Sequence, residues 1–265
     1  MYYPPKGGER GLEQITSRHN AYLTHVRKLL SRRDYRRACG QFVIDGTKLT
    51  REALSTAAPP EAIICTDEAL LPPVPPQVRV IGVPQDVMQS LSPMRAPQGV
   101  LTVCPIPQTE PEARLDGRRY LVLDGLQDPG NVGTIWRTAD ALGADGLLLT
   151  NDCADPWNPK TVRATMGACF RLPVYEVAAT DLPDLLARSG LDLYATALRG
   201  DARDVREADF DRCAVLIGSE GAGVSPELLA QSRFALKIPM RARCESLNAA
   251  AAAAVVLWEM ARQDR

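Results

Sequence analysis

The sequence predicts an α/β protein with a mostly parallel sheet in its carboxy-terminal half and a smaller α/β domain before it. Short apolar segments alternate with helical patterns after residue 118, which is typical of a parallel sheet with helices on both faces. A segment rich in proline and charge separates the two halves. The 265 residues allow two modest domains, and 45% hydrophobic with 24% charged residues is an ordinary globular composition.

The smaller domain is predicted over residues 10–104. Its expected elements are a basic helix, a strand, a second helix and three further strands, at Thr16–Leu30, Phe42–Asp45, Thr47–Thr56, Ala62–Thr66, Val78–Gly82 and Val100–Cys104. Pro72–Pro76 is predicted to be a rigid surface loop, because a proline run cannot continue a helix. Residues 105–118 are predicted to form an interdomain linker.

The larger domain is predicted over residues 119–265. Its expected strands are Tyr120–Asp124, Gly146–Thr150, Leu193–Ala197, Ala214–Gly218 and Ala235–Ile238. The expected helices are Val132–Leu142, Pro159–Gly167, Pro226–Gln231 and a long carboxy-terminal helix from Leu247. In such sheets a ligand binds at the carboxyl ends of the strands, so the loops that follow the strands are the ones to inspect.

Charge is distributed unevenly along the chain. The net charge of −1 gives no overall sign of a nucleic-acid partner, but residues 9–37 hold eight Lys/Arg against three Asp/Glu. Four arginines cluster there, and they either contact RNA phosphates or form a solvated helix face: Arg32, Arg33, Arg36 and Arg37.

Cysteine usage and hydropathy exclude several classes of protein. The cysteines are scattered and form no C-x-x-C pair, which argues against a disulfide framework and against a metal site: Cys39, Cys65, Cys104, Cys153, Cys169, Cys213 and Cys244. No segment approaches the ~18–20 uninterrupted apolar residues of a membrane helix. The first eleven residues have no signal-peptide core, so a cytoplasmic protein without membrane contact is expected.

The first informative loop is Asp124–Gly133, which leads from a buried strand into a helix that contains Arg137. Its glycines allow close backbone approach, and Asn131 is expected to cap the helix. A tight turn alone would explain Gly130 and Asn131 but not the arginine. No G-x-G-x-x-G is present, so a dinucleotide-binding dehydrogenase is disfavoured.

Two more loops follow near the chain end. Leu216–Pro226 places three glycines around Glu220, and its Ser-Pro end predicts a helix start; a plain glycine turn would also explain it. Ile238–Asn248 precedes a run of alanines, with Ser246 as the expected N-cap. The alanines either favour the helix or let another backbone approach closely.

These three loops, in this order, resemble the three signature motifs of the SpoU (TrmH-like) branch of the SPOUT methyltransferases. The likeness includes Asn158–Ala168 with Phe170–Pro173 and covers about Arg119–Arg265. Tyr35–Leu49 resembles the start of the L30e-like, RNA-binding domain that many family members carry.

The resemblance implies a SPOUT fold whose parallel sheet ends in a deep trefoil knot, a rare exception to the rule against threading. It implies S-adenosyl-L-methionine as the cofactor and a homodimer in which the partner subunit completes each active site. The implied cofactor-binding residues are Thr196, Ala197, Leu198, Ile217, Gly218, Gly223, Ile238, Met240, Ser246, Leu247 and Ala249.

The implied reaction is RNA 2′-O-methylation, and the implied catalytic group is Asn131, Arg137, Glu220, Ser246 and Asn248. The two histidines, His19 and His25, lie outside the catalytic half. Arg137 is an awkward base because a guanidinium stays protonated in proteins. We therefore expect Arg137 to bind the adjacent phosphate and lower the pKa of the ribose hydroxyl, while Glu220 or Asn131 orients that hydroxyl. No metal is required, because the sulfonium leaves as a neutral thioether.

The sequence leaves the substrate open. An L30e-like leading domain suits looped RNA and favours 23S ribosomal RNA; the alternatives are tRNA methylation and a catalytically silent RNA-binding or ribosome-assembly factor. A pure binding protein would have no need of Asn131, Arg137, Glu220 and Ser246 together. Housekeeping and antibiotic-resistance methylation would give the same sequence pattern.

Overall fold

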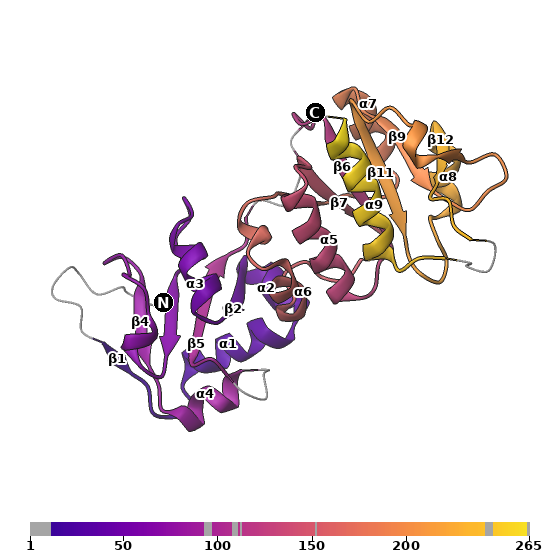
Figure 1. The fold of residues 1–265 in the computed structure, drawn as a ribbon. Helices are drawn as coiled ribbons and strands as arrows, with labels where there is room; N and C mark the ends of the chain where they lie inside the picture. Colours follow the sequence, from indigo (N-terminus) through magenta and orange to yellow (C-terminus); the bar gives the residue numbers. More distant parts are fainter. Residues whose placement is uncertain are drawn as a thin grey trace. The chain divides into compact units, whose positions relative to one another are not determined.

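The computed structural model describes residues 12–92, 97–107, 111, 113–151, 153–241 and 246–263. The chain divides into two compact units, one ending at Pro105 and the other starting at Ile106 (Figure 1). The expected domains, 10–104 and 119–265, lie close to this division. The expected linker differs: Leu115 is buried in the core of the second unit, and its N–H donates to Ser189 Oγ at 2.9 Å. Part of residues 105–118 is therefore packed.

The first unit is built on a five-stranded mixed sheet in the order β1-β4-β3-β5-β2. The strands are β1 (Glu13–Gln14), β2 (Gln41–Asp45), β3 (Ala62–Cys65), β4 (Arg79–Gly82) and β5 (Val100–Pro105). Strand β5 runs antiparallel to β2 and β3, whereas β4 pairs in parallel with β1 and β3. The four expected strands are all present; the short edge strand β1 was not predicted.

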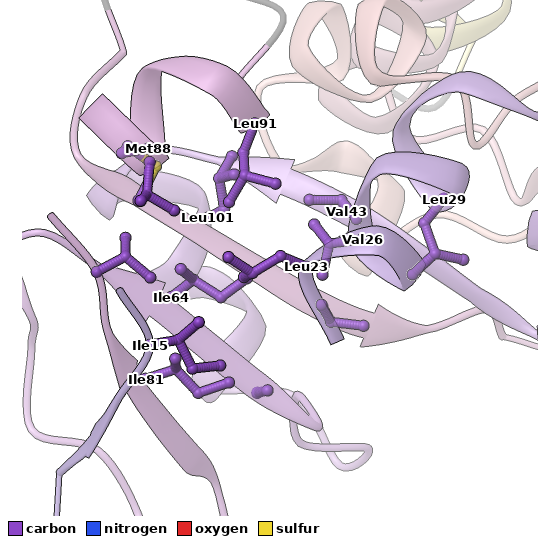
Figure 2. Close-up of a cluster of buried hydrophobic side chains, with 14 residues drawn as sticks. Ile15, Leu23, Val26, Leu29, Val43, Ile64, Ile81, Met88, Leu91 and Leu101 are labelled. Carbon is purple, nitrogen blue, oxygen red and sulfur yellow. The ribbon is translucent and has the colours of Figure 1, made fainter. Parts of the chain in front are cut away.

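Helices cover both faces of this sheet. On one face α1 (Ala21–Ser31) and α4 (Gln85–Leu91) bury leucine, valine and methionine side chains against the strands (Figure 2). Leu23 and Val26 of α1 meet Ile64 and Leu101 of the sheet in this core. Helix α3 (Thr47–Leu54) packs on β2 and β5, and a short 3₁₀ turn, η1, spans Glu68–Leu70.

The basic segment forms two helices, where a single helix over Thr16–Leu30 was expected. Asn20 caps α1 by accepting a hydrogen bond from Tyr22 N at 2.8 Å, which sets the later start. Arg32 is extended, with φ −125° and ψ 116°, and this residue separates α1 from α2 (Arg33–Cys39). Gly40, with φ +63°, then ends α2 in the left-handed conformation that glycine adopts without strain.

The second unit has a seven-stranded sheet in the order β10-β12-β9-β11-β6-β7-β8, and every pair in it is parallel. The strands are β6 (Arg119–Asp124), β7 (Gly146–Thr150), β8 (Val174–Glu176), β9 (Asp192–Thr196), β10 (Arg203–Asp204), β11 (Cys213–Gly218) and β12 (Phe234–Lys237). The parallel sheet expected from the sequence is confirmed. Strand β11 lies between β6 and β9, while β7 lies on the other side of β6, so the strand order reverses beside β6.

Helices also cover both faces of this sheet. On one face, α7 (Leu182–Ser189) and α8 (Pro226–Gln231) bury Leu185 and Leu228 against Val122 and Leu216. On the other face, α5 (Pro129–Ala141) contacts α6 (Pro159–Thr165) and α9 (Ala249–Arg262), which lies on β11 (Figure 1). Two 3₁₀ turns, η2 (Ala168–Phe170) and η3 (Val205–Glu207), complete the unit.

Two expected helix caps are wrong. Helix α5 begins at Pro129, and its cap is Asp128, which accepts from Gly130 N at 2.5 Å; Asn131 lies inside the first turn. Helix α9 begins at Ala249, and its cap is Asn248 rather than Ser246. In both cases another good capping residue stands directly before the helix start, and the expected residue is left with its side chain available for the site.

Other features of the described residues concern cysteines, metals and membranes. Burial raises the pKa of the Cys153 thiol to about 11 and that of Cys213 to about 12, as expected of thiols that pack as small apolar groups; Cys39 is exposed. Within the described ranges no cluster of His, Cys, Asp and Glu could hold a metal ion. None of the helices described is both long and apolar enough to cross a membrane.

Candidate active site

A cavity of about 280 Å³ lies at the carboxyl ends of β9, β11 and β12, next to the start of α9. All eleven residues expected to bind the cofactor line it: Thr196, Ala197, Leu198, Ile217, Gly218, Gly223, Ile238, Met240, Ser246, Leu247 and Ala249. Other residues line it too, namely Ser219, Glu220, Leu236, Lys237 and Ala252. The location agrees with the rule that ligands bind at the carboxyl edge of a parallel sheet.

The lining is mostly apolar, with few charged groups. Leu198 and Leu247 are unusual for large apolar side chains in being 64% and 39% exposed. Glu220 and Lys237 are the ionisable residues among the lining residues described. Such a surface suits a ligand that combines an apolar ring or thioether with a few polar groups.

The turn after β11 explains the three glycines of the second loop. Ser219 and Gly223 exchange two backbone hydrogen bonds, of 3.1 and 2.9 Å, and so close the turn that carries Glu220. This turn folds back over Gly218, where an added Cβ would lie 2.1 Å from Gly223 C and 2.2 Å from Val224 N. Gly218 is therefore required for packing, and Gly223 has φ +71°. Nothing lies within 4 Å of a Cβ built on Gly221.

Three of the five expected catalytic side chains form one hydrogen-bonded chain. Asn248 Oδ1 accepts from Ala250 N at 2.9 Å and from Ala251 N at 3.3 Å, at the start of α9. Asn248 Nδ2 donates to Asn131 Oδ1 at 3.2 Å, and Asn131 Nδ2 donates to Glu220 Oε1. Residues from the first, second and third loops are thus joined directly.

The direction of every bond in this chain is fixed by its ends. The backbone N–H groups of α9 are donors only, and an ionised Glu220 is an acceptor only. The amides of Asn248 and Asn131 must therefore both point their nitrogens toward Glu220. A change at either end forces an amide to turn or leaves two acceptors facing each other.

The N-terminus of α5 is held by Asp128 and Lys160. The Asp128 carboxylate accepts from Gly130 N, and Lys160 Nζ of α6 lies 3.3 Å from Asp128 Oδ1. The hydrogen bond from Gly130 N, helped by Lys160, lowers the pKa of the Asp128 carboxyl. The capped helix start keeps Asn131, in its first turn, beside the Glu220 turn.

The other two expected catalytic residues are placed differently. Ser246 lines the cavity, and its side chain does not cap α9. Arg137 is exposed on α5 and is not among the residues described as lining the cavity. Six helical residues rotate a side chain by about 240° beyond a full turn, so Arg137 and Asn131 project from different sides of α5.

Asp124 is a site residue that sequence reasoning named only as the start of a loop. It is buried, and its carboxyl accepts hydrogen bonds from residues at the end of β7 and after β11. The available signal was an aspartate at the carboxyl end of an otherwise apolar strand, where a charge is costly unless it is bonded. Lys237 was also missed, because a single lysine at a strand end has no distinctive pattern.

The arginine cluster of the first unit divides in two. Arg32 and Arg37 are exposed, and Arg33 is partly buried. Arg36 is 3% exposed, and its Nη1 donates to Leu29 O at 2.6 Å. We therefore correct the expectation for Arg36: it satisfies a carbonyl at the end of α1 and does not face RNA.

Known proteins resemble both units. The family described as "SpoU rRNA Methylase family" matches residues 118–258, and the "MRM3-like substrate binding domain" matches residues 20–102. The 23S rRNA (guanosine(2553)-2′-O)-methyltransferase RlmP of Bacillus subtilis is 32% identical over 250 residues, covering 94% of this chain and 99% of that protein. A 23S rRNA (uridine(2479)-2′-O)-methyltransferase of Streptomyces viridochromogenes is 32% identical over 276 residues, covering 97% and 95%.

Solved structures agree with the sequence comparisons. An AdoMet-bound rRNA methyltransferase from Sinorhizobium meliloti has a TM-score of 0.84 at 29% identity, covering 95% of this chain and 98% of that one. The SpoU methyltransferase AviRb from Streptomyces viridochromogenes, in complex with AdoMet, has a TM-score of 0.81 at 29% identity, with 93% and 98% covered. With its family match, its sequence relatives and the fold of both units in agreement, this chain belongs to the SpoU family of S-adenosylmethionine-dependent rRNA methyltransferases.

Proposed function

We propose that this protein transfers a methyl group from S-adenosylmethionine to a ribose 2′-hydroxyl in 23S ribosomal RNA. The observation that carries the proposal is one cavity lined by all eleven expected cofactor positions, with Glu220 in its wall and bonded to Asn131. Two relatives that match nearly the whole chain are named as 23S rRNA 2′-O-methyltransferases.

The residues present fit the cofactor. Leu198 and Leu247 offer exposed apolar surface for an adenine ring, and Gly218 lets the turn after β11 fold closely over the strand end at the cavity. Glu220 would supply a negative charge for a cationic sulfonium, which is favourable in a mostly apolar pocket. When bound, the cofactor supplies an electrophilic methyl group whose leaving group is neutral.

The protein's own part is to orient the hydroxyl and accept its proton. Asn131 and Asn248 hold the Glu220 carboxylate through a hydrogen-bonded chain that begins at the start of α9. We assign Glu220 the role of orienting the ribose hydroxyl and accepting its proton as the methyl group is transferred, with Ser246 as a second polar contact in the cavity wall. Because a guanidinium group carries a positive charge in proteins, we assign Arg137 to the neighbouring phosphate, where this charge would lower the pKa of the ribose hydroxyl.

We further propose that a homodimer completes each site and that Arg137 reaches it from the partner subunit. Arg137 does not line the cavity of its own chain, whereas α9 begins at that cavity and exposes apolar surface. Ala251 is exposed, Val255 is partly exposed and Trp258 is 51% exposed, at the spacing of one helix face. A second copy would bury this face around a two-fold axis.

Mixing two inactive variants tests the shared site. Arg137→Ala and Glu220→Gln are purified separately, then unfolded and refolded together. If each site takes Arg137 from one chain and Glu220 from the other, the mixture regains roughly a quarter of the wild-type rate, because about half of the randomly formed dimers are mixed and each has one intact site. No recovery, with dimers present by light scattering, would place both residues in one chain.

For the RNA we propose the surface of α1 and α2 as the phosphate-binding face. Arg32 and Arg37 are exposed there, and Lys28 lies over the Tyr35 ring at 5.3 Å. The match of residues 20–102 to a substrate-binding domain supports this assignment. Since RNA of the ribosome is the proposed substrate, we expect the protein to act in the cytoplasm.

Mass-spectrometric mapping of 2′-O-methyl groups tests the substrate. Ribosomal RNA from cells lacking the protein is compared with RNA from cells complemented by the wild type or by Glu220→Gln. We expect one 23S nucleotide to lose its methyl group and only the wild type to restore it. A change confined to tRNA would favour the tRNA alternative. An unchanged methylation map, together with no heat on titrating S-adenosylmethionine, would favour a silent binding factor.

A further inference from the structure

Asp124 joins three segments at the edge of the sheet where the cavity lies. Asp124 is 3% exposed. Its Oδ1 accepts from Thr150 Oγ1 at 3.0 Å and from Asn151 Nδ2 at 2.6 Å, which belong to the last residue of β7 and the residue after it. Oδ2 accepts from Ser225 N at 2.7 Å, where α8 begins. Three donors meet two oxygens, as expected of a carboxylate that acts only as an acceptor.

The bond to Ser225 holds the far end of the Glu220 turn. Asp124 and Gly218 are paired residues at the ends of β6 and β11, so the near end of the turn is fixed by the sheet. Residues 219–224 leave Gly218, carry Glu220 and return to Ser225, whose N–H is bound by the Asp124 carboxylate. Both ends of this turn are thus linked to Asp124, which pairs with Gly218 in the sheet and binds Ser225 N.

The segment that follows Asp124 leads to Asn131. Helix α5 starts at Pro129, five residues after Asp124, and Asn131 lies in its first turn. The partners in the Asn131–Glu220 hydrogen bond therefore come from the segment that begins at Asp124 and from the turn whose far end Asp124 holds. A hydrogen bond between two loops keeps its geometry only while both loops keep their relative position.

We propose that Asp124 is a positioning residue for methyl transfer, which holds the Glu220 turn in register with Asn131 through its bond to Ser225 N. Asp124 is not among the described residues that line the cavity, and it acts through Glu220. This inference rests on the proposed function, because it assumes that Glu220 contributes to methyl transfer.

A control for a purely structural role is the exposed Asp145, at the opposite edge of the same sheet. Asp145 Oδ2 accepts from Arg118 N at 2.7 Å and from Arg119 N at 2.9 Å, at the amino end of β6. Asp145→Ala and Asp124→Ala both remove a carboxylate that binds backbone N–H groups, but only Asp124 is tied to the turn. Both variants are expected to melt at a lower temperature; only Asp124→Ala should slow methyl transfer.

The experiment is a double-mutant cycle between Asp124→Ala and Glu220→Ala. Single-turnover rates of methyl transfer to ribosomal RNA are measured at saturating cofactor. The melting temperature and the cofactor affinity by calorimetry are recorded for each variant. We expect Asp124→Ala to slow the reaction by on the order of 10²-fold, as a misplacement of about 1 Å does. In the double variant the rate should equal that of Glu220→Ala, because the two residues act through one interaction. Asp124→Asn should restore much of the rate, since its amide oxygen can still accept from Ser225 N.

Ser225→Pro keeps the test decisive if Asp124→Ala does not fold. Ser225 has φ −57°, which proline adopts, and it precedes α8, so the change removes the N–H donor without breaking a helix bond. This variant should slow methyl transfer as Asp124→Ala does. Multiplied rate losses in the double variant, or normal rates in both Asp124→Ala and Ser225→Pro, would overturn the positioning role. A Glu220→Ala enzyme as fast as the wild type would instead overturn the role assigned to Glu220, and a wild-type enzyme that transfers no methyl group to ribosomal RNA would overturn the proposed function.

Discussion

The cavity of the second unit and the basic segment of the first unit differ in how their residues are brought together. The cavity is lined by residues between 196 and 252, which the parallel sheet gathers at one edge, and Asn131 is bonded to Glu220 in its wall. The basic segment draws its arginines from six consecutive positions, 32–37. In the cavity, backbone segments from several loops pack against one another and constrain each other's positions. In the basic segment, the position of a residue on the helix turn determines whether its side chain is exposed to solvent. We therefore expect substitutions in the cavity to be far more costly.

The largest effect is expected from Gly218→Ala. The added Cβ would lie within 2.4 Å of backbone atoms of Gly223, which cannot rotate away as a side chain would. The turn must move, and the cofactor cavity with it, so we expect binding of S-adenosylmethionine to weaken by at least about 10²-fold. Isothermal titration calorimetry measures this change. Gly221→Ala, three residues away and with open space around it, is the control and should bind normally; equal weakening in both variants would break the comparison.

A smaller effect is expected at Asn248, where one substitution should lower the stability and another should lower the rate of methyl transfer without changing the stability. Asn248→Ala removes the cap of α9 and should lower the free energy of unfolding by ~1 kcal/mol. Asn248→Asp keeps an acceptor for the helix N–H groups but sets an oxygen against Asn131 Oδ1. We expect wild-type stability in chemical denaturation and a methyl-transfer rate lowered by about tenfold. An Asn248→Asp enzyme with normal rates would remove this link from the hydrogen-bonded chain.

In the basic segment, substitution of the buried arginine should change stability, whereas substitution of an exposed arginine should change RNA binding. Arg36→Ala removes a buried guanidinium and the donor to Leu29 O, so the free energy of unfolding of the first unit should fall by about 1–3 kcal/mol. Thermal unfolding followed by circular dichroism measures this loss.

The smallest effect is expected from Arg32→Ala, which should leave stability unchanged. RNA affinity should weaken modestly, and the slope of log affinity against log salt should fall by about one. Filter binding at several salt concentrations gives both values. If Arg36→Ala changed the salt slope and Arg32→Ala changed the melting temperature, the roles assigned to the two arginines would be reversed.

The sequence predicted the sheet of the second unit and the residues that line its cavity more completely than the helix caps and the short elements. Long apolar strands such as Gly146–Thr150 carry their own signal, and the glycine loops carried the resemblance. The caps of α5 and α9 were misplaced because several capping residues stand side by side, and only the backbone decides between them. The elements α4, α7 and β8 lie in short segments of mixed pattern.

Contacts between distant segments could not be predicted from pattern. The sequence around Asp124 does not predict its hydrogen bond to Ser225, which lies 101 residues later in the chain. Likewise the burial of Arg36 follows from the break between α1 and α2, which a basic composition conceals. The trefoil knot stays a prediction of the family resemblance.

The central claim is tested most directly by methyl transfer in vitro. Unmodified ribosomal RNA is incubated with the protein and S-adenosylmethionine carrying a deuterated methyl group, and the RNA is digested and analysed by mass spectrometry. We predict a single labelled 2′-O-methyl nucleotide in 23S rRNA with the wild type and loss of that label with Glu220→Gln. Label on a base, or no label in RNA despite cofactor binding, would contradict the account.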